Sequence, residues 1–184
     1  MDDEAAMERM RAGDPAGLEH LYRRYFAAIF RFAGRQCGAR PTAEDIAQDT
    51  FVRAFRYAPS HQPVAPVAPW LFRIAFRLCL DRGLQAGRCT PGLPPGADRA
   101  REDPRTAEAA EFQAAVSTAL AALPPAQRAA FLLHRVHGLP IRGVAAILEC
   151  PAGTVKSRVH HAARRLRPLL QAYLKGEGPC ASRS

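Results

Sequence analysis

Hydrophobic residues recur every three or four positions along most of this chain, and polar residues fill the positions between them. Such spacing gathers apolar side chains on one face of an α-helix, whereas a half-buried strand would carry them at every second position. No stretch has the two-residue period, and no segment repeats at a fixed interval. We therefore predict an all-α fold with neither a sheet nor a repeat architecture.

The first strongly patterned helix is predicted to begin where Asp14 is followed by Pro15 and to end near Gly38. Asp is favoured just before a helix because its carboxylate accepts a backbone N–H, and Pro is favoured at the first helical position. The side chains of this helix that we expect in the core are Leu18, Leu21, Tyr22, Tyr25, Ile29 and Phe32.

Two further helices are predicted in the N-terminal half. One runs from residue 41 to about 57 and opens with Thr42 and Asp45, which approximate a capping box. The other begins at Trp70, after the proline-rich segment 59–69, which we expect to be an extended loop. Their predicted core residues are Ala47, Phe51, Ala54, Phe55, Leu71, Ile74, Ala75 and Leu78.

Apolar periodicity then disappears between residues 83 and 107, where Gly, Pro, Arg and Asp dominate. This composition predicts a flexible linker between two small helical domains. Helical spacing returns over 108–123 and again over 126–136, and the two segments are separated by Pro124 and Pro125. Their predicted core residues are Phe112, Val116, Ala119, Leu120, Leu123, Ala129, Leu132, Leu133 and Val136.

The segment from Gly138 to Leu170 predicts two helices joined by a tight turn, with the first ending at Glu149 to Cys150 and the second beginning after Pro151. The shorter helix has Ile141, Val144, Ala145 and Leu148 on one apolar face, and the longer helix has a buried stripe of Val155, Val159, Ala162, Leu166, Leu169 and Tyr173. The opposite face of the longer helix carries Lys156, Ser157, His160, His161, Arg164 and Arg167.

This arrangement is typical of a helix-turn-helix, whose second helix enters the major groove of DNA. No Asp or Glu lies between Cys150 and Gly176, and the last 35 residues contribute +6 of the formal net charge of +9, from seven Lys or Arg residues and one Glu. An amphipathic basic helix alone is usually only a solvated face. The turn motif in front of it favours DNA binding, because a local basic surface fits a polyanion.

Other features exclude several classes of protein. The five cysteines are scattered without metal-ligand spacing, which favours a reduced cytosolic protein. His134 and His137 lack a third ligand, so we expect surface or capping roles for them and predict no metal and no cofactor. The N-terminus is acidic and no apolar run approaches 18 residues, so we expect a cytoplasmic protein without membrane insertion.

The N-terminal half contains AEDIAQDTFVRAFR followed by WLFRIAFRLCLD, and the C-terminal half contains ALPPAQRAAFLLHRVHGLPIRGVAAIL followed by CPAGTVKSRVHHAARRLR. These two pairs of segments resemble region 2 and region 4, respectively, of the extracytoplasmic-function (ECF) sigma factors of the sigma-70 family. The resemblance implies a non-enzymatic subunit that binds core RNA polymerase and recognises promoter DNA. The implied domains are 1–82 for region 2, 83–107 for the linker, 108–175 for region 4 and 176–184 for a tail.

The resemblance also implies three sets of site residues. Region 4 would read the −35 element of the promoter. Region 2 would open the −10 element and dock on the clamp helices of the polymerase. The polymerase flap would be a further contact, and an anti-sigma factor would be a further partner. The −35 set is Thr154, Lys156, Ser157, His160, His161 and Arg164; the −10 set is His61, Val64, Trp70, Arg73 and Arg77; the core polymerase set is Asp45, Gln48 and Asp49. An ordinary solvated face for the acidic stripe, and a core anchor for Trp70, remain the alternatives.

The chain departs from the family pattern at four places. The basic run that often follows Asp81 is diluted here to Arg82-Gly83-Leu84-Gln85-Ala86-Gly87-Arg88. Arg77 stands where the family commonly has Asn, and Gly143 stands where it commonly has Glu. The loop before Trp70 holds mostly Pro, Val and Ala in place of aromatic and polar residues. The promoter sequence therefore does not follow from the resemblance.

Two other functions are alternatives to this one. A free-standing LuxR-like helix-turn-helix regulator would need a sensory or receiver domain, and the N-terminal half offers no acidic phosphoacceptor pocket. A recombinase with an appended DNA reader would need a catalytic Ser or Tyr among arginines, or a carboxylate cluster for Mg²⁺. Association with core polymerase and promoter-dependent transcription separate a sigma factor from both.

Overall fold

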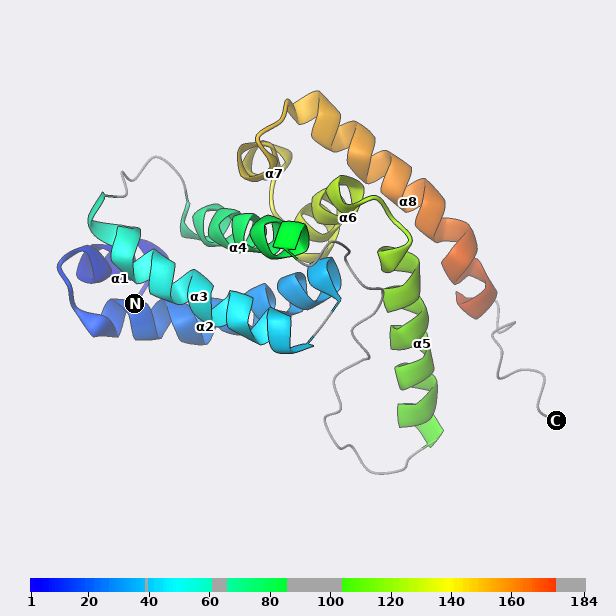
Figure 1. Cartoon of the computed structure of the whole chain (residues 1–184), viewed down its shortest axis with the longest axis horizontal. Coiled ribbons are helices and arrows are strands. Elements are labelled where there is room, and N and C mark those ends of the chain that lie inside the picture. The colour runs from blue at the N-terminus through cyan, green and yellow to red at the C-terminus, as the bar shows by residue number, and fades with distance from the viewer. Residues whose placement is uncertain (39, 61–65, 86–103, 175–184) are drawn as a thin grey trace.

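The computed structural model describes residues 1–38, 40–60, 66–85 and 104–174, and every regular element in these ranges is a helix (Figure 1). The prediction of an all-α fold is confirmed. In chain order the elements are α1 (Asp3–Arg11), α2 (Pro15–Cys37), α3 (Arg40–Tyr57), a 3-10 turn η1 (Ala58–Ser60), α4 (Val67–Gln85), α5 (Pro104–Ala121), α6 (Pro125–Phe131), a π-helical turn η2 (Leu132–Val136), α7 (Ile141–Leu148) and α8 (Ala152–Leu174).

Helix α1 has no counterpart in the sequence prediction. Asp2 caps it by accepting a hydrogen bond from the Ala5 amide at 2.8 Å, and Ala6, Met7 and Met10 are buried against α2. A Cβ at Gly17 would lie 2.3 Å from the Ala6 carbonyl oxygen, so only glycine allows α1 and α2 to approach this closely. The apolar spacing of α1 covers too few turns to stand out in the sequence.

The predicted start and end of α2 are confirmed. Asp14 accepts a hydrogen bond from the Ala16 amide at 2.9 Å, and Gly38 ends the helix in the left-handed conformation with φ of 85°. Tyr22, which was predicted to be buried, is 39% exposed. Its ring stacks on Phe26 at 4.6 Å between centroids, so it packs against other aromatic rings at the edge of the core.

The starts of α3 and α4 differ from the prediction. Because α3 begins at Arg40, Thr42 and Asp45 lie inside the helix and form no capping box. Because α4 begins at Val67, residues 67–69 belong to its first turn. Pro69 is tolerated there because backbone N–H groups in the first turn have no acceptor within the helix, so the N–H that proline lacks costs no helical hydrogen bond. The proline-rich segment is therefore partly helical.

Two predicted core residues in the C-terminal half are exposed. Val136 is 44% exposed because the chain changes from α-helix to a π-helical turn at Leu132, and the wider turn rotates Val136 off the apolar stripe. Phe112 is 38% exposed. It lies about two helical turns before Ala119 and Leu120, where α5 is buried.

The two halves of the chain share one hydrophobic core within the described residues (Figure 1). Helix α4 packs against α7, and the C-terminal part of α2 contacts α5 and α6. The α5–α6 corner is joined to α2 by Arg128, which is 4% exposed. Its guanidinium donates hydrogen bonds to the carbonyls of Leu120 at 2.8 Å, Ala121 at 2.7 Å, Leu123 at 3.1 Å and Gln36 at 2.9 Å.

We predict that Arg128→Met lowers the free energy of unfolding by roughly 3 kcal/mol, because several buried carbonyls lose their donor at once. Chemical denaturation of the full chain measures the change. Arg135→Met, at an exposed arginine of the same segment, is the matched control and should change stability by less than about 0.5 kcal/mol. A loss as small as the control's would contradict this role for Arg128.

Candidate functional site

The turn between α7 and α8 is formed by Glu149, Cys150 and Pro151. Glu149 ends α7 in the left-handed conformation, with φ of 50° and ψ of 47°. The Ala145 carbonyl accepts the amide of Glu149 and also, at 3.2 Å, the amide of Cys150, so one carbonyl at the helix end binds two amides of the turn. Val144 and Val155 are fully buried where the two helices meet. The predicted helix-turn-helix is therefore present.

Helix α8 lies along the outer edge of the molecule, away from α1, α2 and α3 (Figure 1). Val155, Val159, Ala162 and Leu166 are buried, which confirms the predicted stripe over the described side chains. The polar set lies opposite: Lys156, Ser157, His160, His161 and Arg164 are exposed, and Thr154 near the helix start is half-buried. Donors and positive charge are thus presented together on a helix that can enter a DNA groove.

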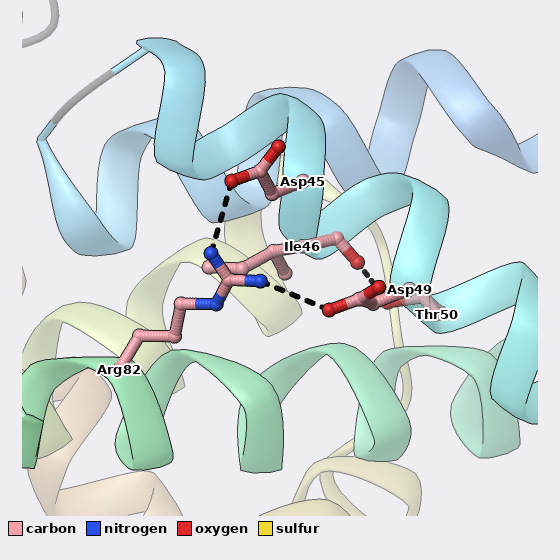
Figure 2. Close-up of polar contacts among 5 residues, drawn as sticks. All are labelled: Asp45, Ile46, Asp49, Thr50 and Arg82. Atoms are coloured by element: carbon pink, nitrogen blue, oxygen red, sulfur yellow. Dashed lines mark hydrogen bonds and ion pairs between the residues drawn. The ribbon is translucent and has the colours of Figure 1, made fainter.

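The acidic stripe of α3 is paired with an arginine from α4 (Figure 2). Nη1 of Arg82 lies 3.0 Å from Oδ2 of Asp45, and Nη2 lies 2.9 Å from Oδ2 of Asp49. Partial burial works against the charge of Arg82, but the hydrogen bonds to both carboxylates raise its pKa overall. Gln48, between the two acids in sequence, is exposed. Sequence reasoning missed Arg82, because the pattern along α3 carries no sign of a partner on another helix.

A cavity of about 410 Å³ is lined by α3, α4 and α7. Trp70 is half-buried on α4, where it packs against the core and also lines this cavity. Arg73 and Arg77 lie on the same wall and are exposed. His61 and Val64 fall outside the described residues. The remaining lining residues are Arg53, Tyr57, Pro69, Ile74, Ala146 and Ile147.

Arg53 and Tyr57 were missed by the sequence prediction. They lie four positions apart on α3 and therefore share one helix face, which points to the cavity. The i, i+4 spacing of an arginine and a tyrosine was the available signal. It became informative only once α4 supplied Trp70 and two further arginines to the same space.

The helix-turn-helix turn contacts the arginines of α4. Nη2 of Arg73 lies 2.8 Å from Oε1 of Glu149, and Nη2 of Arg77 lies 2.6 Å from the same oxygen. Hydrogen bonds from Arg73 and then Arg77 hold the pKa of Glu149 below its ordinary value. The two predicted DNA-binding units are thus connected by a carboxylate of one and two guanidinium groups of the other.

His137 lies at the same junction between the two halves, which corrects the expected surface or capping role. Its ring centroid is 4.7 Å from that of Phe72 and 6.0 Å from that of Phe32. Burial, together with the charges of Arg31 and Arg35, lowers the pKa of His137 from 6.5 to about 4. For the other histidine, Nδ1 of His134 lies 2.9 Å from the Leu139 carbonyl oxygen.

Comparison with known proteins gives the family. The profile "Sigma-70 region 2" matches residues 21–89, and "Sigma-70, region 4" matches residues 113–166. The chain is 36% identical over 164 residues to the ECF RNA polymerase sigma factor SigM of Mycobacterium tuberculosis, which covers 86% of this chain and 80% of SigM. The chain belongs to the ECF sigma factors.

Other relatives agree with this assignment. The ECF RNA polymerase sigma factor SigE of Mycolicibacterium smegmatis is 36% identical over 166 residues, covering 86% of this chain, and the chain spans 64% of the length of SigE. The RNA polymerase sigma-H factor of Pseudomonas aeruginosa is 28% identical over 185 residues, covering 94% of this chain and 96% of that protein.

Solved structures show the same fold. RpoE of Bartonella quintana, crystallised with the anti-sigma factor NepR, aligns with a TM-score of 0.65 and 26% identity over 83% of this ECF factor and 96% of that chain. CnrH, solved with the cytosolic domain of CnrY, aligns with a TM-score of 0.72 and 24% identity over 92% and 97% of the two chains. Over the described residues, no helix is long and apolar enough to cross a membrane.

We predict that the contact between the two halves weakens as the pH falls from about 6.5 toward 4. The pKa of His137 is about 4 in this contact and 6.5 when the ring is free. Between these two pH values the separated form binds a proton on His137 that the packed form does not bind. The contact therefore has its full stability only above pH 6.5 and loses stability as the pH falls toward 4. Trp70, which is the sole tryptophan and lines the cavity with α7, reports separation through its emission.

The matched variant for this measurement is His137→Gln, which cannot gain the charge. A shift of Trp70 emission to longer wavelength between pH 7 and 5 should occur in the parent chain and be much smaller in the variant. Equal shifts in both proteins would assign the pH dependence to another group.

Proposed function

We propose that this ECF sigma factor directs RNA polymerase to a promoter class by binding the core enzyme and both promoter elements. The observation that carries the proposal is the combination in one chain of region 2 and region 4 profiles with an exposed basic helix α8. We assign residues 1–82 to region 2, 83–107 to the linker, 108–175 to region 4 and 176–184 to the tail. Its place of action is the cytoplasm, where promoter DNA and polymerase meet.

For the −35 element we propose that the first turns of α8 lie in the major groove. Lys156 can donate to guanine edges, Ser157 can donate or accept, and neutral His160 and His161 can do either. All four side chains are exposed on one face. Thr154, at the start of the helix, is placed for a phosphate, and Arg164, about two turns after Lys156, is placed for the DNA backbone.

For the −10 element we propose that the cavity beside Trp70 holds an unpaired base. Enzymes and factors that hold a base outside the stack use aromatic surfaces together with basic grooves. The cavity supplies Trp70 and Tyr57 for packing, and Arg73 and Arg77 for the phosphates. His61 and Val64, in the segment before α4, remain proposed members of this set.

For the core polymerase we propose that Asp45, Gln48 and Asp49 dock on the clamp helices, with the flap as a second contact. Arg82 supports this role because it binds one oxygen of each carboxylate and so restricts their orientation. We also propose an anti-sigma partner, because RpoE of Bartonella quintana, a structural relative, was solved with the anti-sigma factor NepR.

The test of core docking is the double variant Gln48→Ala with Asp49→Arg. Charge reversal in the stripe should weaken binding to core polymerase at least tenfold, a loss of about 1.4 kcal/mol, while the full chain still binds −35 duplex DNA. Binding is measured by competition for labelled core enzyme. Glu19→Arg, a charge reversal at an exposed acid of α2, is the control, and undiminished assembly of the double variant would refute the docking surface.

The test of promoter reading compares two basic residues of α8. Lys156→Ala should cost on the order of 1 to 3 kcal/mol and relax the preference at one position of the −35 element. Arg164→Ala should weaken binding to all sequences alike and lower the salt slope by about one counterion. Binding to a panel of −35 duplexes at several salt concentrations distinguishes them, and a uniform loss for Lys156 with a selective loss for Arg164 would reverse the two roles.

A further inference from the structure

The contact between Glu149 and the arginine pair, defined as Arg73 and Arg77, places region 4 against the −10 surface of region 2. One carboxylate oxygen accepts hydrogen bonds from both guanidinium groups, at 2.8 Å and 2.6 Å. Helix α7 packs along α4, and Ala146 and Ile147 of α7 form part of the cavity wall beside Trp70. The surface proposed for the unpaired −10 strand is therefore partly occupied by the chain itself.

We propose that Glu149 is an internal competitor of promoter DNA: its carboxylate takes the place of a DNA phosphate on the arginine pair, so this region 4 contact and −10 binding exclude each other. A carboxylate and a phosphate both accept charge-assisted hydrogen bonds from arginine, and one oxygen already engages both side chains. The DNA half of this inference rests on the function proposed above for Arg73 and Arg77.

The backbone at Glu149 gives independent support. Glu149 is the one non-glycine residue with positive φ in the described part of the chain, and its φ and ψ lie in the left-handed region. Glycine or asparagine is favoured at such a helix end, because a β-carbon costs roughly 1–2 kcal/mol there. The ion pairs with Arg73 and Arg77, which glycine could not form, give a physical reason for a glutamate at this strained position.

Arg77 and Gly143 both lie in the contact. Arg77 supplies the 2.6 Å hydrogen bond to Glu149. Gly143 lies on the side of α7 that faces α4, and a Cβ there would be 3.5 Å from Cγ of Pro69. A β-carbon would fit at this distance, but a longer side chain would have to push α7 away from α4. The sequence of this chain thus favours the contact at both positions.

The contact affects the two DNA-binding surfaces differently. The basic residues of α8 remain exposed at the outer edge of the molecule, while the arginine pair is engaged (Figure 1). Separation also removes the hydrogen bond from Arg128 to Gln36, but Arg128 keeps its three carbonyl acceptors in its own half. The −35 surface is therefore available before the −10 surface is.

The experiment removes the carboxylate in two ways in the full chain. Glu149→Gln removes the charge, and Glu149→Gly removes the side chain and also relieves the left-handed strain. Two readouts are used: emission of Trp70 and its quenching by acrylamide, and the affinity for a short dye-labelled single-stranded DNA of mixed sequence. Glu19→Gln, which breaks an equally exposed ion pair between Glu19 and Arg23 of α2, is the matched control.

Both Glu149 variants should shift Trp70 emission to longer wavelength, increase its quenching and raise the affinity for single-stranded DNA severalfold. The affinity rises because only the separated form binds, and its fraction increases. Thermal stability should not fall in Glu149→Gly, and binding to −35 duplex DNA should match the parent chain. The gain should vanish when Arg73→Ala and Arg77→Ala are added to Glu149→Gly, and Glu19→Gln should behave as the parent.

The possible failures are distinct. If Arg73→Ala with Arg77→Ala abolishes promoter opening by the holoenzyme, but the Glu149 variants change neither Trp70 emission nor DNA affinity, the competition is refuted and the function of the arginine pair stands. If the Glu149 variants change Trp70 emission while DNA affinity stays constant, and the arginine double variant opens promoters normally, both the competition and the −10 role of the pair are refuted.

Discussion

The structure depends on the hydrogen bonds that satisfy Arg128, a buried cation that has no acidic partner among the described residues. Four backbone carbonyls at the ends of α5 and α2 accept its N–H groups, so the negative ends of two helices take the place of a counter-ion. A buried guanidinium without such acceptors would cost several kcal/mol. This requirement fixes the α5–α6 corner against the C-terminal part of α2 and thereby sets the position from which α7 meets α4.

That position brings one carboxylate, of Glu149, against two guanidinium groups, of Arg73 and Arg77, where the two DNA-binding regions meet. Glu149 neutralises part of the basic surface that α4 presents. His137, which packs on Phe72 of the same helix, has its pKa lowered to about 4 by burial and by Arg31 and Arg35. The acidic stripe on α3 is likewise paired internally, through Arg82. Two of the three proposed binding surfaces thus contain ion pairs within the chain, whereas no ion pair among the described residues involves the basic face of α8.

The parts of the site that follow from periodicity were predictable. The buried stripe of α8 from Val155 to Leu166, and with it the exposed position of Lys156 and His160, needs only the repeat of the helix. The parts that need a partner from another element were not. Arg82 lies 33 positions from Asp49, and Arg73 lies 76 positions from Glu149. Neither pairing has a signal within the window in which a helix pattern is visible.

Apart from α1, the sequence by itself determined the main helices, the caps at Asp14 and Gly38 and the helix-turn-helix, because each depends on residues close together along the chain. It failed where local order changed without a local signal, as at the π-helical turn that exposes Val136. The tertiary structure alone decided that the two halves share a core and that Glu149 reaches the arginine pair. Those contacts join residues far apart in sequence, so they are set by how complete helices pack and not by the pattern along any one of them.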